Sequence, residues 1–127
     1  MQHTVLIVDD DPQIRGVITL ALEDAGYYVK AVSNGKQALA EMEAIGFDLV
    51  VLDLSMPDMD GFEFLKAVRA KSSKPKIVVI SGFLGGTLLE AARLFGAVAT
   101  LAKPFSPGSL LSIVDQLLPK IGPVDPV

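Results

Sequence analysis

Residues 4–32 have the sequence TVLIVDDDPQIRGVITLALEDAGYYVKAV, which contains one complete strand–helix–strand unit. The apolar runs Thr4–Val8 and Tyr28–Val32 at its two ends predict β-strands, because they combine β-branched and aromatic residues with polar boundaries. Between them, apolar residues recur at the spacing of one helical face, at Ile14, Val17, Ile18, Ala21, Leu22 and Ala25. The segment is long enough to lead into a second parallel strand, so it predicts a right-handed crossover.

The same alternation continues along the chain. Three further strands are predicted at Asp48–Leu52, Lys76–Ile80 and Val98–Leu101, and the segments between and after them carry helical spacing. Nearly continuous apolar strands that alternate with helices indicate an α/β fold, in which a mostly parallel sheet is covered on both faces. Five units are too few for an eight-stranded barrel, so the predicted architecture is an open, doubly wound (βα)5 sheet of five strands.

The ends of the predicted helices are marked by short sequence signals. Asp11-Pro12 and Ser106-Pro107 each pair a capping side chain with a proline, which the first helical turn accepts without loss of a hydrogen bond. Gly26, Gly46 and Gly96 each follow a helical segment and precede a strand. Glycine adopts left-handed backbone angles without a steric cost, so these three residues are predicted to end helices.

Composition sets limits on the class of protein. The length of 127 residues predicts a single domain over residues 1–120, with the Gly- and Pro-containing residues 121–127 as a tail or linker stub. No apolar run approaches the ~20 residues of a membrane helix, and no basic segment precedes an apolar one as in a secretion signal, so a cytoplasmic protein without a membrane anchor is expected. The net charge of −4 argues against direct nucleic-acid binding. The absence of cysteine excludes disulfides and thiolate chemistry.

Polar side chains follow the predicted strands at their carboxyl ends, where open α/β sheets bind ligands. These residues are Asp9 and Asp10 after the first strand, Asp53 after the third, and Ser81 and Lys103 after the fourth and fifth. Carboxylates packed at one sheet edge repel each other, so a cation must compensate them. An all-oxygen donor set suits a hard divalent ion, and the small number of carboxylates favours Mg²⁺ with several waters over Ca²⁺. Lys103 would add a fixed positive charge.

Four motifs lie on these strand ends in order: VLIVDDDP (5–12), DLVVLDLSMPDMDGFEFL (48–65), VVISG (78–82) and LAKPF (101–105). Together they resemble the receiver domain of bacterial two-component response regulators, and the resemblance extends from residue 4 to about residue 118. It implies a flavodoxin-like fold with the strand order 2-1-3-4-5, which chemotaxis members of the family share. It also implies a phosphoacceptor function in a phosphorelay.

The resemblance assigns roles to the acidic residues. Asp53 would be the phosphoacceptor, taking a phosphoryl group from a phosphohistidine on a histidine kinase or a histidine phosphotransfer protein. Asp9, Asp10 and Asp53 would hold Mg²⁺, together with the backbone carbonyl of Ser55. The protein is therefore expected to be a signalling receiver whose only chemistry is its own phosphorylation and dephosphorylation, and not an enzyme that turns over a substrate.

The resemblance also implies how the signal leaves the site. Lys103 would hold the phosphoryl oxygens, and the Lys103-Pro104 peptide bond would be cis. The Ser81 hydroxyl would donate a hydrogen bond to one phosphoryl oxygen. The Ser81 loop and the fourth predicted helix would then form a protein-interaction surface that phosphorylation switches. Many family members carry an aromatic residue where this chain has Thr100, so we expect weaker coupling between Ser81 and that helix. Phe83 replaces a residue that is often polar, and it could shield the acyl phosphate from water.

Alternative functions remain open at the level of sequence. A magnesium-dependent phosphohydrolase with an aspartyl-phosphate intermediate shares the nucleophilic Asp, the Lys and Mg²⁺, but it typically carries a second Asp two residues after the nucleophile, where this chain has Ser55. A receiver that only binds partners would be expected to lack site residues. The output could be a downstream protein target or an output domain. The last predicted helix carries apolar residues on more than one face, which would suit a partner or a homodimer: Leu110, Leu111, Ile113, Val114, Leu117 and Leu118.

Overall fold

A computed structural model describes residues 2–54, 61–82 and 86–119, and within them strands and helices alternate. The strands are β1 (Thr4–Val8), β2 (Tyr28–Val32), β3 (Leu49–Asp53), β4 (Lys76–Ser81) and β5 (Ala99–Ala102). The helices are α1 (Pro12–Asp24), α2 (Gly35–Ala44), α3 (Gly61–Arg69), α4 (Gly86–Leu94) and α5 (Pro107–Leu117). The predicted strands β3 and β5 are shifted by one residue, and β4 is one residue longer than expected.

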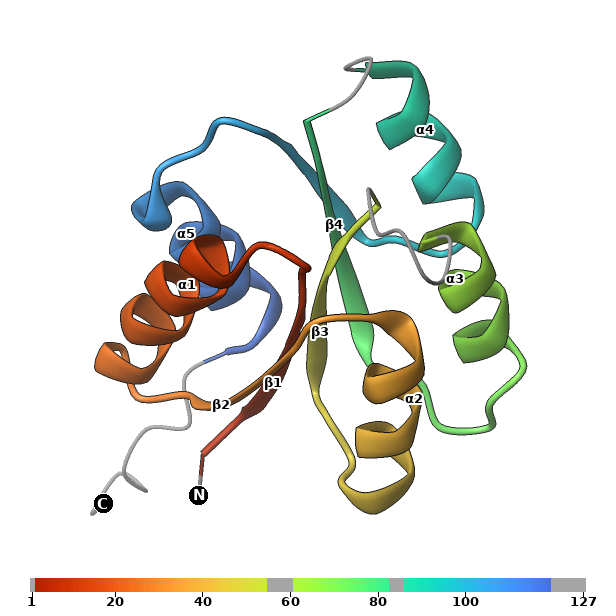
Figure 1. Ribbon diagram of the computed structural model, residues 1–127, viewed down its shortest axis with the longest axis horizontal. Helices are drawn as coiled ribbons and strands as arrows, with labels where there is room; N and C mark the ends of the chain where they lie inside the picture. The colour runs from red at the N-terminus through yellow and green to blue at the C-terminus, as the bar shows by residue number, and fades with distance from the viewer. Residues whose placement is uncertain (1, 55–60, 83–85, 120–127) are drawn as a thin grey trace, which may run out of the picture.

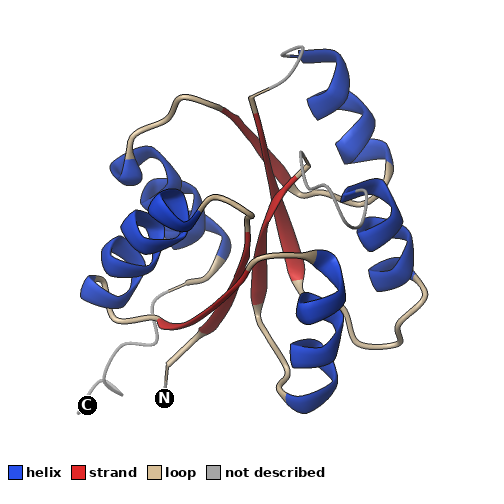
Figure 2. Ribbon diagram, in the orientation of Figure 1, coloured by secondary structure: helices blue, strands red, loops and turns tan. Residues whose placement is uncertain are grey.

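The strands form one parallel sheet in the order β2-β1-β3-β4-β5. Helices α1 and α5 cover one face, and α2, α3 and α4 cover the other (Figures 1 and 2). After β2 the chain passes back over β1 to form β3, so the direction in which strands are added reverses between β1 and β3. The predicted (βα)5 architecture and the strand order 2-1-3-4-5 are therefore confirmed.

Two hydrophobic cores lie on the two faces of the sheet, and the alternation of side chains along each strand divides the apolar residues between them. The core under α1 and α5 contains Val5 and Ile7 of β1, Leu49 and Val51 of β3, and Val78 and Ile80 of β4. The core under α2, α3 and α4 takes the intervening residues Leu6, Val8, Val50, Leu52, Ile77 and Val79. All of these side chains are at most 4% exposed, which explains why the three central strands are apolar except at their ends.

The signals for helix ends are only partly confirmed. Asp11 accepts hydrogen bonds from the N–H groups of Gln13 and Ile14 at the start of α1, and Ser106 accepts one from Ser109 at the start of α5. Gly26 and Gly96 have positive φ angles of 100° and 106°, as predicted. The prediction for Gly46 is wrong, because its φ is not in the left-handed region; α2 ends instead through the extended backbone of Ile45, at φ −134°.

The apolar surface differs from the sequence interpretation. In α5, Leu111, Ile113 and Leu117 are half-buried and pack against the core, and the expected partner or homodimer surface on this helix stays a prediction. In α1, Val17 is 51% exposed, although its spacing placed it with the core residues, and Leu20 is 70% exposed. Residues 121–127, the predicted tail, lie outside the described residues. Within the part of the chain that is described, no helix has the length and apolar character needed to cross a membrane.

Candidate phosphoryl and metal site

The acidic residues of two neighbouring strands meet at the carboxyl edge of the sheet. Because β1 pairs directly with β3, Asp9 and Asp10 after β1 lie next to Asp53 at the end of β3. One carboxylate oxygen from each of the three residues lies within 4.8 Å of the other two. Asp9 is fully buried and Asp53 is 1% exposed, whereas Asp10 is exposed to solvent. The structure therefore gathers three carboxylates into a half-open cluster.

Lys103 reaches this cluster from the far side of β4. It follows β5, and its backbone N–H donates to the carbonyl of Ser81 at 2.9 Å. Its Nζ lies 3.1 Å from Oδ2 of Asp53 and 3.4 Å from Oδ2 of Asp9. The Lys103-Pro104 peptide bond is cis, as the resemblance implied. One ammonium group thus bridges the two buried carboxylates.

The charges of the cluster do not balance, and this affects the ionisation of its members. Burial raises the pKa of Asp9 above its ordinary value; Asp53 raises it further, while hydrogen bonds from the Asp11 N–H and from Lys103 oppose these effects only in part. Burial alone would lower the pKa of Lys103, but the carboxylates of Asp53 and Asp9 outweigh that effect and raise it. The site thus favours the charged form of Lys103, which faces three carboxylates.

Local hydrogen bonds shape the loop that carries Asp9 and Asp10. The N–H of Asp9 donates to the carbonyl of Val32 at 3.2 Å, and Oδ1 of Asp9 accepts from the N–H of Asp11 at 2.9 Å. From α1, Nη1 of Arg15 donates to the carbonyl oxygen of Asp9 at 2.8 Å. Nothing in the sequence marks Arg15 for this contact, because a hydrogen bond to a backbone carbonyl requires no particular partner side chain.

Ser81 and Thr100 lie on the other side of the sheet edge. Ser81 is the last residue of β4 and is 1% exposed; by strand alternation it follows Ile77 and Val79, whose side chains face α2, α3 and α4. Thr100 of β5 pairs in register with Val79, two residues before the pair of Ser81 and Ala102. Ser81 and Thr100 therefore belong to the same face. The other two predicted positions, Ser55 and Phe83, lie outside the described residues.

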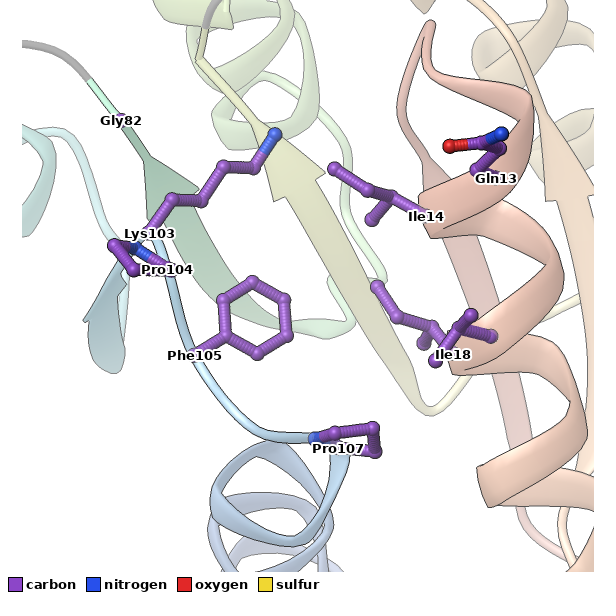
Figure 3. Close-up of a pocket in the computed structure, with 9 residues that line it drawn as sticks. Gln13, Ile14, Ile18, Gly82, Lys103, Pro104, Phe105 and Pro107 are labelled. Atoms are coloured by element: carbon purple, nitrogen blue, oxygen red, sulfur yellow. The ribbon is translucent and has the colours of Figure 1, made fainter.

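An apolar cavity of about 550 Å³ opens beside Lys103. Figure 3 shows Ile14 and Ile18 of α1 on one side of it and Phe105 and Pro107 on the other, with the side chain of Lys103 along its upper edge. The cavity also includes the exposed Val17. Its size is that of an ordinary ligand or side-chain pocket, and Lys103 belongs both to its lining and to the charged cluster.

The donor set of the cluster fits a hard divalent cation. The three candidate ligands are all carboxylate oxygens, close enough to share one ion, and the exposure of Asp10 leaves one side open to water. Mg²⁺ prefers oxygen ligands and keeps several waters, so it suits a site with few protein ligands and an open side. A cation would also offset the excess negative charge that Lys103 leaves uncompensated.

A doubly wound parallel sheet with acidic residues and a lysine at its carboxyl edge is the architecture of a receiver domain, a signalling class of α/β domain. Residues 5–115 match the family model "Response regulator receiver domain". The chain belongs to this family, and it is a response regulator receiver domain of the two-component type.

Individual relatives agree with this assignment. The chain is 30% identical over 119 residues to sporulation initiation phosphotransferase F of Bacillus subtilis, covering 94% of this chain and 96% of that protein. It is 36% identical to the chemotaxis response regulator CheY4 of Vibrio cholerae, whose structure matches with a TM-score of 0.86 over 93% of this chain and 100% of the other.

Other relatives are longer proteins. The chain is 32% identical over 114 residues to the DNA-binding response regulator MtrA of Mycolicibacterium smegmatis, covering 90% of this chain and 50% of that protein. It is 35% identical over 121 residues to the probable transcriptional regulator ycf27 of Cyanidium caldarium, covering 94% and 48%. The chain thus spans about half the length of these regulators.

Proposed function

We propose that this receiver domain accepts a phosphoryl group on Asp53 from a phosphohistidine of a histidine kinase or a histidine phosphotransfer protein. The observation that carries the proposal is the environment of Asp53, a buried carboxylate with the Lys103 ammonium at 3.1 Å and two further carboxylates within the span of one metal ion. We place this reaction in the cytoplasm, where ATP supplies phosphoryl groups to kinases.

The chemistry needs positive charge at the site, because both reactants are anionic. A carboxylate oxygen of Asp53 forms a bond to phosphorus while the bond from phosphorus to the histidine nitrogen breaks, and the released imidazole keeps the electron pair and takes up a proton. Lys103 would neutralise charge on the transferring oxygens, and the buried position of Asp53 orients its carboxylate for an in-line approach. The product is an acyl phosphate, which water hydrolyses, so the signal decays.

We assign Mg²⁺ to the acidic cluster. Asp9, Asp10 and Asp53 would hold it, with the backbone carbonyl of Ser55 as a further ligand. When bound, Mg²⁺ supplies positive charge next to the transferring oxygens. Without it, three carboxylates face an incoming phosphoryl group with Lys103 alone to offset them, so transfer should be lost.

The partner that donates the phosphoryl group would cover the cavity between α1 and the segment after β5. This cavity borders Lys103, and the exposed Val17 offers apolar surface beside it. A phosphohistidine carrier that brings its imidazole to Asp53 must approach across this rim. We therefore expect Val17→Asp to slow transfer from a phosphorylated protein donor, while transfer from acetyl phosphate stays at the wild-type rate. Equal slowing with both donors would contradict this surface.

The output is proposed to pass from Ser81 to α4. Donation from the Ser81 hydroxyl to the phosphoryl group would bias the position of the loop after β4, and Phe83 in that loop would limit access of water to the acyl phosphate. Thr100 lies on the same face as Ser81, but it lacks an aromatic ring that could fill space there. The recipient would be a downstream protein or an output domain. Direct contact with nucleic acid is not part of this proposal, given the net charge of −4.

The coupling through Thr100 can be measured with a phosphoryl mimic. We expect beryllofluoride to raise the affinity for the downstream partner by less than a hundredfold, which corresponds to ~2.7 kcal/mol. A Thr100→Tyr variant should show a larger gain. A hundredfold gain in the wild type would contradict weak coupling.

The central proposal is tested by incubation with acetyl phosphate and Mg²⁺, followed by intact mass measurement. We expect one added phosphoryl group in the wild type, none in Asp53→Asn, and none in the wild type with EDTA. Modification of Asp53→Asn would place the acceptor elsewhere. Sustained turnover of a free phosphoester such as p-nitrophenyl phosphate would instead favour a phosphohydrolase.

A further inference from the structure

Arg15 of α1 contacts the loop that carries the acidic residues, and the proposed phosphoryl transfer gives it no role. Its Nη1 donates to the carbonyl oxygen of Asp9 at 2.8 Å, and the residue is half-buried. This carbonyl belongs to the peptide group that joins Asp9 to Asp10. A peptide group is planar, so a hydrogen bond to its oxygen also fixes the direction of the N–H and the Cα of the next residue. Arg15 thereby fixes the backbone from which the Asp10 side chain projects.

Asp10 needs such support more than the other two acidic residues do. Asp9 and Asp53 are enclosed by the protein, and each carboxylate is also held by Lys103. Asp10 is exposed, so packing does not select one orientation of its carboxylate. Its direction depends on the backbone of the loop between β1 and α1.

The rest of that loop is held on both sides of the Asp9 carbonyl. Before it, the N–H of Asp9 is bonded to Val32 of β2. After it, the N–H of Asp11 is bonded to the Asp9 carboxylate, and Asp11 in turn caps the start of α1. The carbonyl between these points is held by Arg15. The loop is thus held at Asp9 and at Asp11, and the Arg15 side chain holds the peptide group before Asp10.

From this geometry we propose that Arg15 is a positioning residue that presents Asp10 to Mg²⁺. The inference rests on the proposed function, because it assumes a metal ion at the acidic cluster. Arg15 would have two opposite effects: its charge disfavours a nearby cation, whereas its hydrogen bond orients a ligand of that cation. Salt screens the first effect, with a Debye length of about 8 Å at 0.15 M ionic strength, but does not weaken the second. Groups that orient metal ligands typically contribute about 10- to 100-fold in affinity.

The test is a titration of the full chain with MgCl₂ by isothermal calorimetry in 0.15 M NaCl. We expect Arg15→Met, which removes both the charge and the donor, to bind Mg²⁺ about tenfold more weakly than the wild type. Arg15→Lys keeps the positive charge and a hydrogen-bond donor group, so its affinity for Mg²⁺ should lie between those of Arg15→Met and the wild type. Arg69→Met removes an exposed arginine at the end of α3 and should bind like the wild type. Equal or tighter binding by Arg15→Met would overturn the proposal.

A second measurement separates positioning from a general loss of structure. The rate of phosphorylation by acetyl phosphate is followed at increasing Mg²⁺ concentration. In Arg15→Met the half-saturating concentration should rise about tenfold while the maximal rate is retained. A variant that is partly unfolded would instead lose maximal rate without a shift of the midpoint, and this result would count against positioning. If Arg15→Met does not fold, Arg15→Gln is used with the same criteria.

Different results would overturn the proposed function and the proposed role of Arg15. A wild-type chain that does not bind Mg²⁺, or is not phosphorylated on Asp53, overturns the proposed function. A wild-type chain that does both, together with an Arg15→Met variant that needs no additional Mg²⁺, overturns the role of Arg15 alone.

Discussion

At the scale of single residues, the site places identical side chains in different environments. Asp9 and Asp10 are neighbours in sequence, yet one is fully buried beside Asp53 and Lys103 and the other is exposed. Two buried carboxylates share the Lys103 ammonium group, and burial raises the pKa of Asp9, which means that its charged form is disfavoured in the folded chain. Such an arrangement lowers the stability of the metal-free protein, and it is typical of sites shaped for a ligand rather than for the fold.

This cost predicts that Asp9→Asn stabilises the metal-free protein at neutral pH. The pKa of Asp9 is raised above 3.8 in the folded chain, mainly by burial. A carboxyl group whose pKa is higher in the native state than in the unfolded state stabilises the native state at pH values below its unfolded-state pKa. This contribution is lost as the pH rises through its native-state pKa. The variant should therefore gain about 0.5–2 kcal/mol at pH 7 in EDTA, and its advantage should disappear below about pH 3.8. Urea unfolding of the wild type and the variant at several pH values measures this difference in stability.

Asp24→Asn is the matched control, because it removes the same charge at the exposed end of α1. It should change stability by no more than about 0.5 kcal/mol. Equal gains in both variants would attribute the effect to net charge, and not to the buried cluster.

At the scale of elements, the start of α3 depends on a glycine. A Cβ atom at Gly61 would lie 2.9 Å from the Cα of Leu54 and 2.7 Å from its Cδ2. Backbone cannot move away as a flexible side chain can, so Gly61→Ala should destabilise the protein by about 1–3 kcal/mol. Gly16→Ala serves as the control, because nothing lies within 4 Å of its Cβ position in the exposed face of α1.

The control variant Gly16→Ala should change the stability in the opposite direction. Alanine is favoured over glycine by about 0.5–1 kcal/mol inside a helix, so Gly16→Ala should raise the urea midpoint while Gly61→Ala lowers it. A Gly61→Ala variant with wild-type stability would show that α3 can begin without this close approach.

A second contact between elements joins the turn before β2 to α5. The hydroxyl of the buried Tyr27 donates to Oδ1 of Asp115 at 2.5 Å, and burial together with Asp115 raises the pKa of the phenol. Tyr27→Phe removes this bond and should cost about 1–2 kcal/mol in the free energy of unfolding. Tyr28→Phe removes the same atom from a side chain that is 44% exposed, and it should have little effect. A similar loss in both variants would contradict a specific role for the bond to Asp115.

At the scale of the whole molecule, the fold could be predicted because its signals are periodic. Strand alternation places Val5 and Ile7 on one face and Leu6 and Val8 on the other, so a buried strand must be apolar throughout. The site could be predicted because parallel strands end at one edge, which gathers Asp9, Asp53 and Lys103 wherever they lie in sequence. Features that depend on a particular contact could not be predicted, and these include the bond from Arg15 to a backbone carbonyl.

The errors have a common physical cause as well. Helical spacing assigned Val17 to the core, but only Ile18 and Leu22 of α1 are fully buried, because a helix lying on a sheet buries a narrow stripe. In α5 the buried face is wider, because α1 packs beside this helix and the core contacts more of its apolar side chains. The expected partner or homodimer surface on α5 stays a prediction. The width of a buried face depends on which neighbours surround a helix, and a single helix sequence does not contain that information.

Because Asp10 and Asp53 come from strands that are distant in sequence, only the folded chain assembles the proposed metal site, and Mg²⁺ should stabilise it as a whole. At a concentration 100 times its dissociation constant, a ligand specific for the native state adds about 2.7 kcal/mol to the free energy of unfolding. We expect Mg²⁺ at this concentration to raise the free energy of unfolding of the wild type by this amount. The urea midpoint should rise accordingly without a change in the slope, since the surface exposed on unfolding is the same. NaCl of equal ionic strength should not reproduce the shift, and Asp10→Ala should lose most of it. A midpoint that rises equally in Asp10→Ala would locate the stabilising ion outside the acidic cluster.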